Sequence, residues 1–179
     1  MTNLISTGLA TRLVAAAAAQ GLKVTTAESC TGGLIGGTLT SVAGASSVYD
    51  GGFVTYANEA KRDMLGVPWE MLMDVGAVSA PVAEAMATGA LNATDARCHL
   101  AVSVTGIAGP GGGTAEKPVG LVYFGLATRF PDAALTVNHQ RIVFRESGRE
   151  NIRLRTVEEA LKMLLGAIDQ VQGKSHERG

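Results

Sequence analysis

The spacing of apolar and polar residues changes repeatedly along the chain between a helical and a strand-like period. From Leu4 to Val14 the large apolar residues recur at helical spacings, and Gly21 follows as a C-cap, so we expect a helix over 4–20. The next segment, "LKVTTAES", is rich in β-branched residues and predicts a buried strand. Further strands are expected in "GGFVTYAN", "CHLAVSVTG", "VGLVYFGLATR" and "LTVNHQRIVF", and further helices over 31–41, 59–65, 68–73, 79–94 and 147–171.

The order of these elements predicts the class of fold. Helices alternate with strands through most of the chain, whereas the last two predicted strands follow each other without a helix between them. The near-continuous apolar run "CHLAVSVTG" is typical of a strand that is covered on both faces. We therefore expect a single three-layer α/β/α domain over residues 1–172, with a mixed sheet of about five or six strands, and a polar tail over 173–179.

The composition is that of a compact globular chain with few features that attract large charged partners. Of 179 residues, 46% are hydrophobic and 17% are charged, and the net charge is −1 with no basic stripe. Because nucleic-acid binding depends on clustered Lys and Arg, we expect no nucleic-acid partner. Two cysteines are too few for a secreted disulfide framework, and no apolar run reaches the roughly 18 residues of a membrane helix, so we expect a cytoplasmic protein with no membrane partner. A weakly charged chain rich in Ala and Gly suits self-association, and we expect a homo-oligomer.

Hydroxyl groups and glycines gather where three of the predicted strands end. The segments are "ESCTGG" after the first strand, "TYANEAK" after the second and "VTGIAGPGGG" after the third. In an open α/β sheet, ligands bind beyond the carboxyl ends of the strands. We therefore expect these segments to form one site.

The motifs offer little support for metal or dinucleotide chemistry. His99, His139 and His176 are scattered along the sequence, and neither cysteine belongs to a CxxC motif. "GPGGGTAEK" lacks the GxxxxGK[ST] order of a phosphate-binding loop, and "GGLIGG" lacks the GxGxxG spacing of a dinucleotide fold. The sequence therefore predicts no metal and no resident cofactor.

The turn after the first strand and one lysine are the remaining candidates for chemistry. Thr31, Gly32 and Gly33 open a predicted helix, where exposed amides suit a phosphate or an oxyanion, although the same glycines also suit close helix packing. With no suitably placed histidine, a hydrolase needs another base, and Lys61 is a candidate if burial or a neighbouring cation lowers its pKa. Cys30 is a weaker nucleophile candidate, because no histidine is placed to generate its thiolate.

Five motifs carry a more specific signal. They are "TTAESCTGG", "GGFVTYANEAK", "GAVSAPVAEAMATGA", "VTGIAGPGGGTAEKPVG" and "FRESGRENIR", and they cover nearly the whole chain. Together they resemble the C-terminal domain of the competence/damage-inducible CinA family, the nicotinamide mononucleotide deamidases. The resemblance implies a metal-free Ser/Lys amidohydrolase that converts a small nucleotide substrate, nicotinamide mononucleotide, to nicotinic acid mononucleotide and ammonia. The family name also records a link to competence and DNA damage, so a non-catalytic nucleotide-binding or regulatory module is the alternative.

The resemblance also implies roles for particular residues. Ser46, the loop serine before "GGFVTY", is expected to be the nucleophile and Lys61 the general base, with Tyr56 as a proton relay or orienting hydroxyl between them. Ser29 in "ESCTGG" is the rival nucleophile, and Ser47 replaces Ser46 if the register shifts by one residue. If Ser46 attacks, the hydroxyl of Ser29 and the amides of the following glycine turn remain to stabilise the oxyanion.

Substrate binding is expected to fall to two further segments. Thr105 and Gly106 end the third strand and should hold the substrate together with the loop from Gly109 to Gly113. Arg149 is expected to bind the 5′-phosphate, because its guanidinium can form paired hydrogen bonds and it lies near the start of the last predicted helix. The alternatives to it are Arg145 and Arg153.

Overall fold

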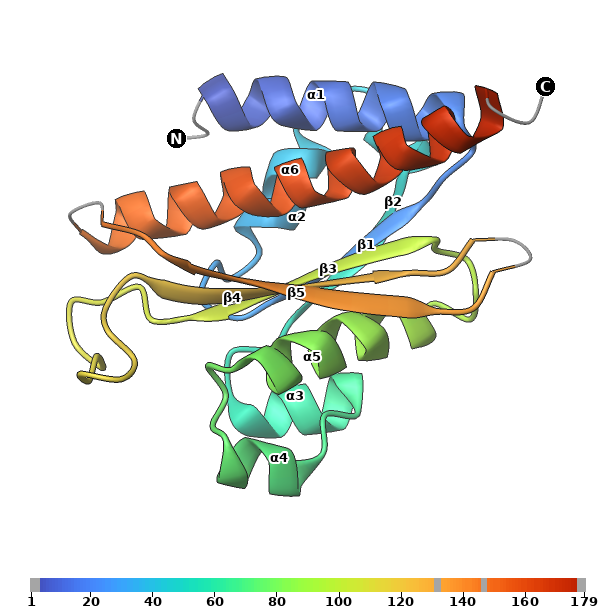
Figure 1. Ribbon diagram of the computed structural model, residues 1–179. Coiled ribbons are helices and arrows are strands. Elements are labelled where there is room, and N and C mark those ends of the chain that lie inside the picture. The colour runs from blue at the N-terminus through green and yellow to red at the C-terminus, as the bar shows by residue number, and fades with distance from the viewer. Residues whose placement is uncertain (1–3, 131–132, 146–147, 177–179) are drawn as a thin grey trace.

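One mixed sheet of five strands runs through the middle of the protein, as Figure 1 shows. The computed structural model describes residues 4–130, 133–145 and 148–176. The strands are β1 (Val24–Glu28), β2 (Tyr49–Val54), β3 (Leu100–Gly106), β4 (Leu121–Thr128) and β5 (Thr136–Val143), in the spatial order β2-β1-β3-β4-β5. β1 pairs in parallel with β2 and β3, whereas the β3–β4 and β4–β5 pairs are antiparallel. The predicted mixed sheet is therefore confirmed.

Helices cover both faces of this sheet, which confirms the three-layer architecture (Figure 1). One face is covered by α1 (Leu4–Ala19), α2 (Leu34–Thr40) and α6 (Arg149–His176). On the other face α5 (Ala80–Asn92) lies against the sheet, and α3 (Asn58–Leu65) and α4 (Trp69–Asp74) pack against α5. Among the described helices, none combines the length and the apolar character needed to cross a membrane.

Two helix boundaries differ from those expected by three residues or more. α2 begins at Leu34 instead of residue 31, because Gly32 and Gly33 take left-handed backbone conformations, with φ of 61° and 96°, and form a turn before it. α6 continues to His176, so the first part of the expected polar tail is helical. Ser147, the expected first residue of this helix, and residues 177–179 lie outside the described residues.

Side chains alternate between the two faces along the central strand β3. Leu100, Val102 and Val104 belong to the core beneath α1, α2 and α6, whereas Ala101 belongs to the core beneath α3, α4 and α5. On this second face the backbones lie close together. A Cβ at Gly125 of β4 would be only 2.3 Å from the carbonyl oxygen of Ala83 in α5. Glycine therefore allows α5, and with it the loop before α5, to lie close to the sheet.

The carboxyl ends of the three parallel strands meet at one edge of the sheet. Glu28, the last residue of β1, pairs with Val54 at the end of β2 and with Val104 near the end of β3. Each strand leads directly into one of the three hydroxyl- and glycine-rich segments, which therefore gather at this edge as expected. The short 3-10 helix η1 (Ala45–Ser47) precedes β2 and lies at the opposite edge.

Candidate active site

The turn that follows β1 is held by a buried carboxylate, Glu28, which is 1% exposed. Its oxygens accept hydrogen bonds from the amides of Gly33 (3.0 Å), Ile35 (3.0 Å) and Gly36 (2.8 Å). Amides at the start of a helix lack partners within it, and a carboxylate also suits the positive end of the helix dipole. Glu28 therefore fills the anion-binding position at the start of α2.

This carboxylate corrects the expectation that the amides of the glycine turn are free for an oxyanion or a phosphate. The Gly33 amide donates to Glu28, and the Gly32 amide donates to the carbonyl oxygen of the residue three positions earlier, at 3.1 Å. The side chain of Thr31 is fully buried and does not line the pocket described below. Within the described turn, the amides that bond neither to a backbone carbonyl nor to Glu28 are those of Cys30 and Thr31.

Lys61 reaches the same edge of the sheet from the helix that follows β2. α3 begins at Asn58, and helical side chains lean towards the N-terminus of their helix, so Lys61 extends back towards the strand ends. Its Nζ lies 3.1 Å from the Oγ of Ser29, 2.8 Å from the carbonyl oxygen of Thr55 and 3.2 Å from that of Tyr56. These acceptors satisfy the three N–H groups of an ammonium, and the side chain is only 1% exposed.

Burial sets the ionisation of this lysine. Removal from water disfavours the charged ammonium, and this desolvation lowers the pKa of Lys61 to about 8. The three oxygens around its Nζ belong to a hydroxyl and two carbonyl groups, which carry no full charge. Lys61 can therefore lose its proton near neutral pH, and its neutral amine then has a lone pair for the hydroxyl proton of Ser29.

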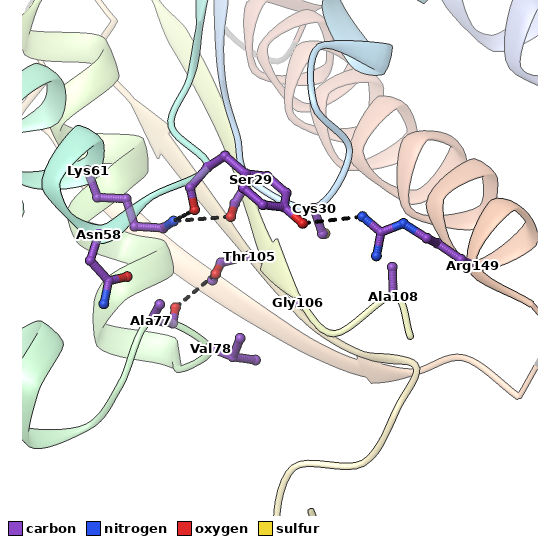
Figure 2. A pocket seen from close by; sticks show the side chains of 11 residues that line it. Ser29, Cys30, Asn58, Lys61, Ala77, Val78, Thr105, Gly106, Ala108 and Arg149 are labelled. Atoms are coloured by element: carbon purple, nitrogen blue, oxygen red, sulfur yellow. Dashed lines mark hydrogen bonds between the residues drawn. The ribbon is translucent and has the colours of Figure 1, made fainter. Parts of the chain in front are cut away.

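Ser29 and Lys61 line a pocket of about 200 Å³, shown in Figure 2. Its walls come from the turn after β1, the segment between β2 and α3, α3 itself, the loop before α5, the end of β3 with the loop after it, and the first residue of α6. The lining residues are Ser29, Cys30, Tyr56, Asn58, Lys61, Ala77, Val78, Thr105, Gly106, Ala108 and Arg149. The pocket thus combines an apolar wall with hydroxyl, ammonium and guanidinium groups.

Arg149 lies across the pocket from Lys61 (Figure 2). Its Nη1 donates to the carbonyl oxygen of Gly109 at 3.0 Å, and its Nη2 donates to the hydroxyl of Tyr56 at 3.3 Å. Arg149 is exposed, and a guanidinium has five N–H donors, so it retains donors for a ligand. Tyr56 is 65% exposed, and its hydroxyl contacts Arg149 instead of lying between a serine and Lys61, which corrects its expected place.

The end of β3 contributes to the pocket as expected. Thr105 and Gly106 both line it, and the Oγ1 of Thr105 donates to the carbonyl oxygen of Ala77 at 2.8 Å. This bond joins β3 to the loop before α5. A Cβ at Gly106 would lie 2.7 Å from the carbonyl oxygen of Leu121, so glycine permits the close approach of β4 here. Gly109 lies outside the lining and holds the guanidinium at the pocket through its carbonyl oxygen.

Ser46 lies at the opposite end of β2 from Lys61. It belongs to η1, its side chain is exposed, and the six residues of β2 separate it from the helix that carries the lysine. At ~3.3 Å per residue this strand spans about 20 Å. The neighbouring Ser47 donates to the carbonyl oxygen of Gly44 at 2.9 Å, so a register shift does not change the result. The expected contact between Ser46 and Lys61 is therefore wrong, and the hydroxyl beside the lysine is that of Ser29.

The two alternative phosphate ligands lie outside the pocket. Arg153 of α6 donates through Nε to the carbonyl oxygen of Cys30 at 3.1 Å and through Nη2 to that of Thr31 at 2.8 Å. Arg145 is exposed in the segment between β5 and α6. Of these three arginines, Arg149 is the one that lines the pocket.

Sequence reasoning missed several contributors to the site. Glu28 had a usable signal, because an acidic residue directly before a glycine turn and a helix is suited to hold the first helical amides. Asn58 lines the pocket and stands in "YANEAK", just after a strand end, where a polar side chain is a candidate ligand. Ala77 and Val78 stand in the motif "GAVSAPVAEAMATGA", but nothing in the sequence marked them as pocket residues, since apolar pocket walls resemble other loop residues.

The described residues favour a hydroxyl over a thiol as the nucleophile. Burial raises the pKa of the Cys30 thiol to about 11, so it stays protonated near neutral pH. Among the described residues, no group of three or more His, Cys, Asp or Glu is placed to hold a metal ion. The candidate chemistry of the pocket therefore rests on Ser29 and Lys61.

Fold and pocket together define an α/β domain with a buried lysine beside a serine at the carboxyl ends of its parallel strands. The sequence pattern of the CinA C-terminal domain matches residues 6–168 of this chain. The chain therefore belongs to the CinA C-terminal domain family.

Relatives that carry functional names share much of the sequence. The chain is 57% identical over 110 residues to the nicotinamide-nucleotide amidohydrolase PncC of Escherichia coli K12. The aligned region covers 62% of this chain and 66% of that protein. It is 47% identical over 151 residues to a CinA-like protein of Chlorobaculum tepidum, covering 84% of this chain and 35% of that protein. The chain thus spans about a third of the length of this longer relative.

Solved structures of the same superfamily have the same fold. The crystal structure of the competence/damage inducible protein CihA from Agrobacterium tumefaciens matches with a TM-score of 0.86 and 51% identity, over 94% of this chain and 98% of that chain. A CinA superfamily protein from Escherichia coli matches with a TM-score of 0.81 and 32% identity, over 89% of this chain and 88% of that chain. The predicted α/β fold is therefore confirmed by comparison as well.

Proposed function

We propose that this chain is an amidohydrolase that converts nicotinamide mononucleotide to nicotinic acid mononucleotide and ammonia. The observation that carries the proposal is the 3.1 Å contact, inside the pocket, between the buried Nζ of Lys61 and the Oγ of Ser29. The choice of substrate is supported by the Escherichia coli relative named nicotinamide-nucleotide amidohydrolase, 57% identical over 110 residues. In this proposal Ser29, and not Ser46, is the nucleophile.

In the first half of the reaction, the Oγ of Ser29 attacks the carboxamide carbon while Lys61 accepts the hydroxyl proton. A neutral amine has two N–H groups and one lone pair; the carbonyl oxygens of Thr55 and Tyr56 hold the N–H groups and leave the lone pair for Ser29. A C–O bond forms, and the carbonyl electron pair moves onto oxygen. Protonated Lys61 then donates its proton to the amide nitrogen, and the C–N bond breaks. Ammonia departs, and an acyl-enzyme on Ser29 remains.

In the second half, a water molecule occupies the position that ammonia has vacated and attacks the acyl carbon. Lys61, neutral again, accepts a proton from this water as the new C–O bond forms. The bond to Ser29 then breaks, and Lys61 returns the proton to its Oγ. One water is consumed and one ammonia is released per turnover, so the reaction is balanced without a redox partner.

We assign the amide of Cys30 to the developing oxyanion. This residue directly follows Ser29 and lines the pocket, and its N–H has no backbone acceptor among the described residues. The amide of Ser29 itself is unavailable, because it donates to the carbonyl oxygen of Val104 at 3.1 Å. A single oxyanion donor of this kind is worth about 10²–10³ in kcat.

Arg149 is assigned to the 5′-phosphate of the substrate. Whole-ligand pockets commonly measure ~300–1,000 Å³, so the pocket of about 200 Å³ suits the pyridine carboxamide alone. The ribose and phosphate would then extend towards the exposed guanidinium of Arg149. That guanidinium can bind phosphate through paired hydrogen bonds, and the N-terminus of α6 adds its dipole.

The proposal is tested by measuring ammonia release from nicotinamide mononucleotide with a metal chelator present. We expect turnover by the native protein and none by Lys61→Met, with thermal melting used to show that the variant is folded. Turnover that disappears with the chelator would contradict the mechanism. Thermal stabilisation by nicotinamide mononucleotide without ammonia release would contradict the activity and favour the nucleotide-binding module. The homo-oligomer, the absence of a nucleic-acid partner and the cytoplasmic location stay predictions.

A further inference from the structure

A guanidinium outside the pocket holds the backbone beside the proposed nucleophile. Arg153 of α6 is partly buried and donates to two consecutive carbonyl oxygens, those of Cys30 at 3.1 Å and Thr31 at 2.8 Å. These bonds join the last helix to the turn after the first strand, 123 and 122 residues apart in the sequence. Because Arg153 does not line the pocket, its contact is with the turn and not with the position of the substrate.

Both peptide planes that flank Cys30 are fixed through their carbonyl oxygens. In a planar trans peptide, the C=O and the N–H point in opposite directions, so an anchored carbonyl also orients the amide of its plane. The carbonyl oxygen of Ser29 accepts from the Gly32 amide at 3.1 Å, and this plane carries the N–H of Cys30. Arg153 anchors the next plane through the carbonyl oxygen of Cys30. Cys30 therefore cannot rotate about its backbone bonds without breaking one of these hydrogen bonds.

The far end of the same turn is held by the opposite charge. Glu28 accepts the amide of Gly33, and the amides of Ile35 and Gly36 beyond it. A cation thus holds carbonyl groups at Cys30, and an anion holds amides at the start of α2. Of these two charged groups, Arg153 is the one bonded to the backbone of Cys30, through its carbonyl oxygen.

We propose that Arg153 is a positioning residue for the amide hydrolysis: by holding the Cys30–Thr31 peptide it fixes the backbone dihedral angles of Cys30 and so, together with the Gly32 bond to the Ser29 carbonyl, keeps the Cys30 amide aimed at the oxyanion. The inference rests on the proposed function and adds a residue that acts through the backbone. Preorganised donors accelerate a reaction because they need no reorientation when charge develops. Release of the Cys30 carbonyl would let the Cys30–Thr31 peptide turn and leave the neighbouring plane, which carries the Cys30 amide, held by the Gly32 bond alone. A less well-aimed amide weakens stabilisation of the transition state more than substrate binding. The expected signature is therefore a fall in kcat with little change in KM.

The first test compares arginine variants with nicotinamide mononucleotide as substrate. Arg153→Met keeps an unbranched side chain but has no N–H donors, and we expect kcat to fall about 100-fold with KM changed less than about threefold. Arg153→Lys should recover part of the rate, because an ammonium can reach a carbonyl oxygen without reproducing the fork of the guanidinium. Arg149→Met, which removes the proposed phosphate ligand, should instead raise KM. Arg97→Met is the neutral control, since its ion pair with Asp50 lies at the other end of the sheet.

A second measurement follows the reactivity of Ser29 without this substrate. A fluorophosphonate labels an activated serine, and intact mass gives both the rate and the final fraction labelled. We expect Arg153→Met to be labelled more slowly than the native protein but to the same final fraction. A role in folding alone would give the opposite result: a lower final fraction, with an unchanged labelling rate for the molecules that are folded. The apparent pKa of labelling should stay the same in the variant, since Arg153 does not contact Lys61.

Turnover and labelling of the native protein test the proposed function. The kcat and the labelling rate of Arg153→Met, each divided by the native value, test this inference. Native turnover together with a slow, fully labelled Arg153→Met supports both. A raised KM with unchanged kcat would place Arg153 in substrate binding and overturn the inference, as would an unchanged kcat and labelling rate. A native protein that neither turns over nor labels at Ser29 would overturn the proposed function and the inference with it. If Arg153→Met does not fold, the same criteria apply to Arg153→Lys.

Discussion

Ser29 and Ser46 lie in turns at opposite ends of the same pair of parallel strands. Ser29 follows the carboxyl end of β1, is 8% exposed and contacts the Nζ of Lys61 at 3.1 Å. Ser46 precedes the amino end of β2, and its side chain is exposed. Both turns contain left-handed glycines, Gly32 in one and Gly44 in the other, so local backbone conformation does not distinguish them.

The difference between the two turns comes from what the sheet brings to each end. At the carboxyl ends, Lys61 extends from α3 back towards the strand ends. The surrounding elements exclude water from its ammonium group, and this lowers the pKa of Lys61 to about 8. At the amino end, the neighbouring hydroxyl of Ser47 forms only a local bond to Gly44. A serine becomes a candidate nucleophile here because of the end of the sheet on which it lies.

The largest expected effect comes from exchanging the two serines for alanine in turn. Ser29→Ala should lower kcat by about 10⁴, because no other hydroxyl lies beside Lys61 among the described partners of its Nζ. Ser46→Ala should leave kcat within about twofold, as is usual for exposed positions away from the reacting groups. Steady-state ammonia release measures both. The comparison breaks if Ser46→Ala is the inactive variant.

The next effect is the pH dependence of kcat/KM for the native protein. The active form of Lys61 is the neutral amine, and its pKa is lowered to about 8 by burial. Below that pKa the neutral fraction falls about tenfold per pH unit, so kcat/KM should rise by the same factor per unit and level off above about pH 8. A flat profile from about pH 6 to 9 would argue against Lys61 as the general base.

A smaller effect is expected from the arginine across the pocket. Arg149→Met should raise KM for nicotinamide mononucleotide by about 10–100-fold, because a charge-assisted hydrogen bond is worth roughly 1.5–3 kcal/mol. The same variant should leave the KM for nicotinamide riboside, which lacks the phosphate, nearly unchanged. Equal effects on the two substrates would remove Arg149 from phosphate binding.

The smallest effect concerns stability at the carboxyl end. Glu28→Gln should lower the free energy of unfolding by about 1–3 kcal/mol, because the glutamine NH₂ group would face amide donors that now bond to the carboxylate. Glu116→Gln, at an exposed loop position, is the matched control and should change stability by less than about 0.5 kcal/mol. Urea unfolding measures both, and equal losses would show that the carboxylate at the start of α2 has no special role.

The elements and the end of the sheet that carries the site were accessible from the sequence. Periodicity separates strands from helices such as α5, and segments that follow parallel strands must gather at one edge. The partner of Lys61 was not accessible in this way. Ser46 and Lys61 stand on either side of the predicted strand "GGFVTYAN", and the length of that strand separates them. The contact of Ser29 with Lys61 depends instead on the parallel pairing of β1 with β2, and this pairing links residues that are far apart in the chain.

Two further features needed three-dimensional information. Arg149 and Arg153 are four residues apart on α6 and lie on similar sides of it, so helical spacing cannot separate the pocket ligand from the residue that holds the Cys30 carbonyl. The amides before α2 were expected to be free for an anion. A carboxylate of the chain itself, Glu28, takes that position.

The most direct test of the central claim is to identify the serine that carries the acyl group. Native protein is mixed with a substoichiometric amount of nicotinamide mononucleotide, quenched with acid before deacylation and digested. No lysine or arginine lies between Lys23 and Lys61, so trypsin leaves both serines in one peptide, and fragmentation in the mass spectrometer must locate the adduct. We predict an acyl adduct on Ser29. An adduct on Ser46 would contradict the account.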